Sequence, residues 1–71
     1  MNKKIAEFMV MCVNDFAREK HLAVKESFNY LNEHKGLDYL QDYYDIEHTL
    51  SPADTVEALT IVCKQNGGDL Q

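Results

Sequence analysis

The sequence has no apolar run approaching the ~20 residues that cross a bilayer, so it predicts no membrane-spanning helix. Its basic start is not followed by a small-residue cleavage site, so no signal peptide is expected. It has only three glycines, all at the ends of helix-like segments, which excludes a glycine-rich phosphate loop. Its two cysteines, Cys12 and Cys63, lack the spacing of a zinc site. We expect them to be free, buried thiols of a cytoplasmic protein; a disulfide between them is the alternative.

Basic residues are missing from the middle of the chain, in a protein of net charge −5. Between residues 37 and 58 there is no lysine or arginine, and the acidic side chains are Asp38, Asp42, Asp45, Glu47, Asp54 and Glu57. Such a segment repels phosphate backbones and anionic membranes, so we expect neither nucleic acid nor a membrane as partner. Its charge favours a basic protein surface as partner, although a solvated acidic face that only maintains solubility explains the same pattern.

Apolar residues recur at the spacing of three and four that is typical of amphipathic helices, and no period-two alternation competes with it. We therefore predict an all-α protein, a compact bundle of three main helices plus one short helix. A single helical domain is expected over residues 1–67, with a disordered tail over residues 68–71. The predicted helices are Lys3–Lys20, Val24–Glu33, Leu37 to about Tyr44 or Asp45, and Pro52–Gln65.

The ends of these helices are marked by residues with defined capping chemistry. Asn2 precedes the first helix and Ser51 the last, and both side chains can accept hydrogen bonds from free N–H groups of the first turn. Pro52 suits the first helical position because its missing N–H would have no partner there. Gly36 is expected to end the second helix as its C-terminal glycine, and Gly67 to end the last in a left-handed turn.

The first and last helices are apolar around more of their circumference than one buried face requires. On the first, apolar residues cover an arc of roughly 200°, and Met11 stands apart on the polar side. On the last, Val62 widens the apolar stripe and Ile61 lies among polar neighbours. We expect these surplus apolar faces to contact another protein or a second copy of the chain. The residues expected to point into the core from the second and third helices are Val24, Phe28, Leu31, Leu37, Leu40 and Tyr44.

Two tyrosines in the acidic segment are candidate contact residues. Tyr39 and Tyr43 lie four positions apart and form a ridge on one helix face, beside Asp38 and Asp42 on another. Tyrosine is enriched at protein interfaces because it offers a large area and a polar tip. An equal alternative for this pair is that the rings only complete a small core. The full set of candidate interaction residues is Met11, Asp38, Tyr39, Asp42, Tyr43, Ile61 and Val62.

Asp45, Glu47 and His48 concentrate metal-binding side chains, but no second histidine stands three or four positions from His48, as a helical zinc site requires. We expect no metal and no cofactor, and we expect His48 to bond a backbone group at a tight corner. Catalysis by a pair of carboxylates would need a cleft that raises one pKa, for which a small helical bundle leaves little room. Neither cysteine is paired with a base in the sequence, so the chain is expected not to be an enzyme.

The order of these features resembles a family of small bacterial helical proteins classed only as a domain of unknown function. The resemblance covers roughly residues 5–65. It rests on Glu-Lys-His-Leu at 19–22, Lys-Glu-Ser-Phe at 25–28, Gly-Leu-Asp-Tyr at 36–39, Tyr43-Tyr44 and His48-Thr49. Members are often encoded beside proteins that look like ADP-ribosyltransferase toxins, so the resemblance implies an antitoxin-like or accessory role. It implies no catalytic residues.

Together these features predict a small non-catalytic protein-interaction module. It would bind a protein partner of basic character, or itself as a homo-oligomer, through apolar faces of the first and last helices. The alternative function is a helix-turn-helix DNA-binding regulator, because small helical bundles often contain that motif. Against this alternative, the segment 37–45 that would contact DNA carries three aspartates and no basic residue.

Overall fold

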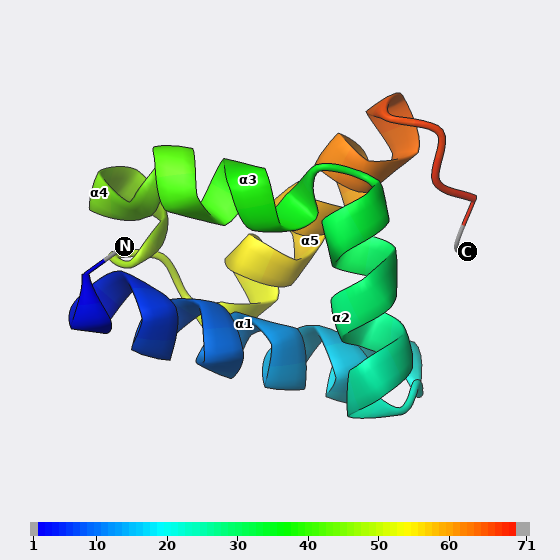
Figure 1. Ribbon diagram of the computed structural model, residues 1–71, viewed down its shortest axis with the longest axis horizontal. Helices are drawn as coiled ribbons and strands as arrows, with labels where there is room; N and C mark the ends of the chain where they lie inside the picture. Colours follow the sequence, from blue (N-terminus) through cyan, green and yellow to red (C-terminus); the bar gives the residue numbers. More distant parts are fainter. Residues whose placement is uncertain (1, 70–71) are drawn as a thin grey trace.

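The computed structural model describes residues 2–69, and every regular element in that range is a helix. The helices are α1 (Lys3–Lys20), α2 (Val24–Glu33), α3 (Gly36–Asp42), α4 (Tyr44–Glu47) and α5 (Pro52–Gln65). In Figure 1, α3 lies over α1, α2 closes one end, and α5 crosses behind them. The all-α prediction is confirmed, while residues 70–71 of the predicted tail lie outside the described residues. No helix in the described part is long and apolar enough to cross a membrane.

The capping groups begin and end the long helices at the residues that the sequence predicts. Asn2 Oδ1 accepts a hydrogen bond from a backbone N–H of α1 at 2.9 Å, and Ser51 Oγ accepts from the Asp54 N–H at 3.2 Å. Pro52 is the first residue of α5, and Gly67 adopts a left-handed conformation after it, with φ of 89°. Local chemistry therefore sets the limits of α1 and α5.

The prediction that Gly36 ends α2 is wrong. Lys35 takes the left-handed conformation, with φ of 70°, and Gly36 is buried as the first residue of α3. A Cβ atom at Gly36 would lie 2.8 Å from Leu31 Cδ2 on α2 and 3.1 Å from Cys63 Sγ on α5. Glycine is required there by the close approach of three helices and not by its own backbone conformation.

The predicted short helix is divided into two at Tyr43. Its backbone, at φ −113° and ψ 25°, departs from helical geometry, so α3 stops and the single turn of α4 starts in a new direction. His48 Nδ1–H donates to the Tyr44 carbonyl oxygen, and the two rings stack with centroids 4.5 Å apart. The prediction that His48 bonds a backbone group at a tight corner is confirmed.

The core lies where α1, α2, α3 and α5 meet. The largest fully buried side chains include Phe16, Leu31, Leu40, Leu59 and Cys63. Two aromatic contacts extend this core, edge-to-face between Phe8 and Tyr44 (centroids 5.4 Å apart) and stacked between Phe16 and Tyr30 (5.9 Å).

Two residues expected in the core, Val24 and Phe28, lie at the surface, where they are 52% and 48% exposed. The buried residues of α2 are Ser27 and Leu31 instead. The small side chain of Ser27 lets α2 lie close against the core. Because successive helical residues are turned by about 100°, burial of Ser27 directs Phe28 toward solvent.

Candidate interaction surfaces

Five of the predicted interaction residues line one depression between α3 and α5, which we call the tyrosine face. They are Asp38, Tyr39, Asp42, Tyr43 and Val62, and Lys35 completes the lining. The two aspartates and Tyr43 are exposed, whereas Tyr39 and Val62 are partly buried. Spacing along one helix identified the first four residues, and the fold adds Val62 from α5.

The two tyrosines of this face are held differently. Their rings contact each other, with centroids 5.0 Å apart and planes inclined by 40°. The Tyr39 hydroxyl donates to Glu47 Oε2 at 2.8 Å, whereas Tyr43 is 51% exposed. Burial and the hydrogen bond to Glu47 raise the pKa of Tyr39 to about 12, so its hydroxyl stays protonated at neutral pH. Tyr39 is thus an anchor, and Tyr43 presents its ring to solvent beside it.

Glu47 belongs to the acidic segment of the sequence, but its side chain is buried. It is 4% exposed; Oε2 accepts the hydrogen bond from Tyr39, and Oε1 has no hydrogen-bond partner among the described residues. Asp15 on α1 is also buried, and it accepts a hydrogen bond from Arg18 at 2.9 Å. Burial, followed by the charges of Asp15 and Glu47, raises the pKa of Cys12 to about 12. Cys12, Asp15 and Arg18 follow one another at a spacing of three on α1, whereas the contact between Tyr39 and Glu47 joins two helices and has no such spacing.

Of the groups considered for metal binding or catalysis, Glu47 and His48 make hydrogen bonds within the fold, the two cysteines are buried, and Asp45 is exposed. Among residues 2–69, no three histidine, cysteine, aspartate or glutamate side chains gather as a metal site would require. Cys12 and Cys63 are free, buried thiols, as the sequence predicts. Burial raises the pKa of Cys63 to about 11, so both sulfurs are protonated, weak nucleophiles at neutral pH.

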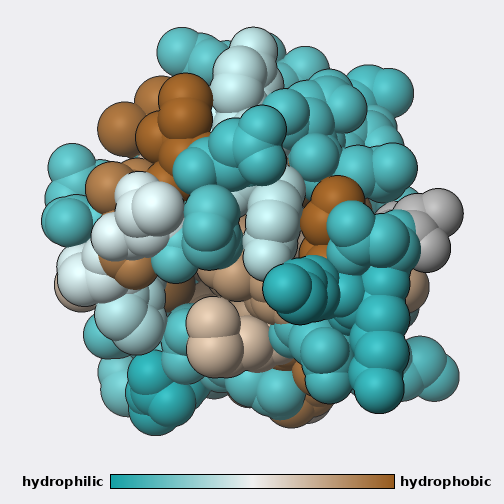
Figure 2. Space-filling view, turned by 90° about the vertical axis from the view of Figure 1, so that its left-hand side faces the viewer, coloured by the Kyte–Doolittle hydropathy of each residue, from teal (hydrophilic) through white to brown (hydrophobic). Residues whose placement is uncertain are grey.

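The remaining candidate residues, Met11 and Ile61, lie outside the lining of the tyrosine face. They are 51% and 50% exposed, on α1 and α5. The exposure of Met11 agrees with its expected place on the polar side of α1. Figure 2 shows the side of the molecule that carries α4, where apolar side chains emerge as separate patches among hydrophilic ones.

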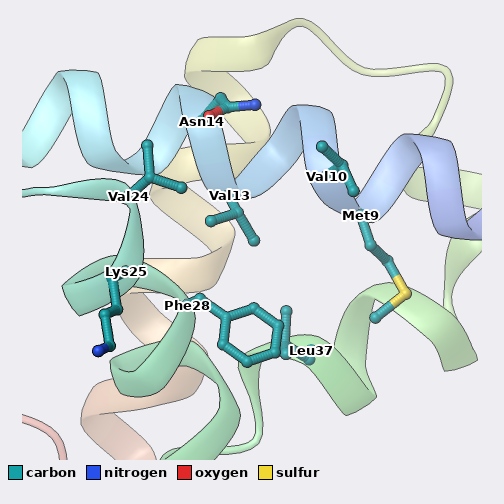
Figure 3. A pocket seen from close by; sticks show the side chains of 8 residues that line it. All are labelled: Met9, Val10, Val13, Asn14, Val24, Lys25, Phe28 and Leu37. Carbon is teal, nitrogen blue, oxygen red and sulfur yellow. The ribbon is translucent and has the colours of Figure 1, made fainter.

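A second surface, which sequence analysis did not identify, is an apolar groove between α1, α2 and α3. Its larger apolar lining residues are Met9, Val10, Val13, Val24, Phe28 and Leu37. In Figure 3, Val13, Phe28 and Leu37 converge from three helices, and Met9 reaches from α1 toward α3. Ala6 from α1 also lines it, and its polar lining residues are Asn14 and Lys25 at one end and Asn32, Asp38 and Gln41 at the other. We call this set the apolar groove.

The edges of the apolar groove are unusually exposed for apolar side chains. Val10 is 62% exposed, and Val24 and Phe28 are about half exposed, whereas Val13 and Leu37 on the floor are buried. The sequence indicated the exposure of Val10 only indirectly, through the wide apolar arc of the first helix. Phe28 was missed because it shares a helical stripe with Leu31, which is in the core.

Most of this chain matches the model of one protein family. The model of the family described as "Protein of unknown function (DUF3791)" matches residues 7–66. The chain belongs to this family. Comparison with curated proteins and with solved structures gave no match. The DUF3791 match extends from α1 to the end of α5, so it includes the tyrosine face and all of the apolar groove except Ala6.

Proposed function

We propose that this DUF3791 chain is a non-catalytic protein-interaction module that binds a basic protein through its tyrosine face. The observation that carries the proposal is the convergence of Tyr43, at the junction of α3 and α4, with Val62 of α5, with exposed Asp38 and Asp42 beside them. A tyrosine ring attracts an arginine or lysine side chain through its negative face, and the carboxylates add charge complementarity. Tyr39, held by Glu47, supports the ring of Tyr43 and reduces the ordering that binding requires.

The charge of this surface favours a protein over a nucleic acid. Lys35 is the only basic residue among the six that line the tyrosine face. Helix α3, which the DNA-binding alternative would use for recognition, exposes Asp38 and Asp42. Carboxylates at that position repel phosphates, whereas nucleic-acid affinity depends on lysine and arginine. No contact in the described fold favours the DNA-binding alternative.

The biological role that we propose is antitoxin-like or accessory. This role rests on the resemblance to a family whose members are often encoded beside ADP-ribosyltransferase-like toxins. The location that we propose is the cytoplasm, because Cys12 and Cys63 are free thiols, which persist in a reducing compartment. We also propose that the chain self-associates.

The proposal is tested by affinity capture from a lysate of the source organism, with tagged wild-type chain and two variants. Tyr43→Ala and Asp42→Lys should each reduce recovery of a basic protein at least tenfold, as loss of an interface hot spot does. Their melting temperatures should stay near the wild-type value, because both residues are exposed.

The matched control for charge reversal is Glu19→Lys, at an exposed position of α1 outside the tyrosine face. It should recover the same protein in full. Equal recovery with Asp42→Lys, or a retarded DNA band at low salt in place of a protein, would contradict the proposed function.

A further inference from the structure

We infer that the apolar groove is the interface of a symmetric homodimer, in which a second copy of this chain covers α1, α2 and α3. The inference rests on the proposed self-association and names its surface. That surface differs from the one used for a basic partner: Asp38 is the one residue that lines both, whereas Val10 and Phe28 belong to the groove alone and Tyr43 and Asp42 to the tyrosine face alone.

The shape of the groove suits contact with itself. Val10 projects from its edge, whereas Val13 and Leu37 are buried on its floor. A two-fold interface brings the same patch of both copies together, so each patch must supply both a protrusion and a recess. Val10 and the floor of the groove meet this requirement within one patch.

The charges at the two ends of the groove are also self-complementary. Of its lining residues, Lys25 stands at one end and Asp38 at the other, and the lining has no net charge. A two-fold axis that crosses the groove at its middle brings opposite ends of two copies together, so Lys25 faces Asp38 of the partner subunit at both ends; an axis along the groove would place like charges together. Two chains of net charge −5 repel each other over most other approaches, which favours contact through this neutral surface.

The groove runs along two helices, and a stable dimer would cover it together with the surface around it. A standard interface buries about 800 Å² per partner, about a sixth of the 4698 Å² surface of this chain. The lining extends from Ala6 to Asn14 on α1 and from Val24 to Asn32 on α2, with α3 closing one end. Two turns of each of two helices are therefore available, with an apolar centre and polar groups at the ends, as interfaces commonly have.

The pairing of the two ends is tested by a charge-swap cycle, read by sedimentation equilibrium over a hundredfold dilution. We expect the wild type to be dimeric and to dissociate on dilution. Lys25→Asp and Asp38→Lys should each raise the dimer Kd about tenfold, through lost pairs and new like-charge contacts. The double variant should restore the Kd to within about threefold of the wild-type value, because the pairs reform with reversed signs. A double variant as weak as the singles, or a monomeric wild type, would overturn the inference.

The place of the interface on α1 is tested by Val10→Asp against Met11→Asp. The two positions are adjacent and comparably exposed, at 62% and 51%, but only Val10 lines the groove. Val10→Asp should give a folded monomer with the wild-type circular dichroism spectrum, and Met11→Asp should keep the dimer mass. A dimer that survives Val10→Asp, or is lost in Met11→Asp, overturns the groove as interface. Neither result bears on binding through the tyrosine face, which the Tyr43→Ala and Asp42→Lys variants test separately.

Discussion

The apolar groove and the tyrosine face show two ways in which a small helical protein exposes aromatic side chains. On the tyrosine face, Tyr39 is anchored by a hydrogen bond to buried Glu47, and Tyr43 leans on it. In the groove, Phe28 is 48% exposed and supplies only apolar surface. Contacts within one chain thus hold the tyrosines of the tyrosine face in position. No contact within the described chain explains why the apolar side chains of the groove are exposed, and a second copy that covers them would.

The two surfaces also differ in where their binding energy would originate. Covering the groove removes apolar area from water, at roughly 25 cal/mol per Å². The tyrosine face offers less apolar area, but its rings are already positioned, so less side-chain entropy is lost on binding. A contact through the groove should therefore depend on size and shape, and a contact through the tyrosine face on charge and ionic strength.

The largest effect is expected where the groove is compared with the core beneath it. Leu59→Ala should lower the free energy of unfolding by about 2–5 kcal/mol, because Leu59 is fully buried. Phe28→Ala should lower it by about 1 kcal/mol or less when the chain is monomeric, because half of the ring is already in water. Urea denaturation at low protein concentration measures both. If the two variants lost equal free energy of unfolding, Phe28 would belong to the core, and the groove would not be a separate surface.

A smaller effect should separate the two tyrosines. Tyr39→Phe leaves the Glu47 carboxylate buried without its one hydrogen bond, so we expect a loss of about 1–3 kcal/mol. Tyr43→Phe should change stability by less than about 0.5 kcal/mol, because its side chain is exposed. The same denaturation measurement serves for both. If Tyr39→Phe were neutral, the anchoring of the tyrosine face would be wrong.

A further effect concerns stability at alkaline pH. The pKa values of Cys12 and Tyr39 are raised to about 12, from 9.0 and 10.0, and that of Cys63 to about 11. The unfolded chain therefore loses these protons first, so the stabilisation is fully present below about pH 9 and decreases as the pH rises toward 12. The urea midpoint should fall over this range, and less steeply in Cys12→Ala. A midpoint that rises above pH 9 would contradict the burial of these groups.

The sequence predicted the helices well because their ends depend on neighbouring residues. Asn2 and Ser51 act on the first turns of their own helices, and both were identified from local chemistry alone. Gly36 was misread because the reason for glycine there is the close approach of Leu31 on α2 and of Cys63 on α5, which only the packing of three helices creates. A pattern along one segment carries no information about such an approach.

The candidate surfaces were predictable to the extent that they lie on one helix. Spacing along α3 was enough to group Tyr39 and Tyr43, which the fold brings to one depression. Burial of Glu47 depends on Tyr39, a residue of another helix, and its sequence neighbours gave the opposite expectation. The groove was missed because Phe28 and Ser27 compete for the inward face of α2, and only packing against the other helices decides between them.

The assignment of the two surfaces to different contacts can be tested by NMR of the ¹⁵N-labelled chain during a hundredfold dilution. If the groove joins two copies, the amide signals of Val10, Val24 and Phe28 should move together as the dimer dissociates. The signals of Tyr43 and Val62 should stay in place, because neither residue lines the groove. A shift of the Tyr43 and Val62 signals on dilution, with no shift at Val10, Val24 and Phe28, would contradict this assignment.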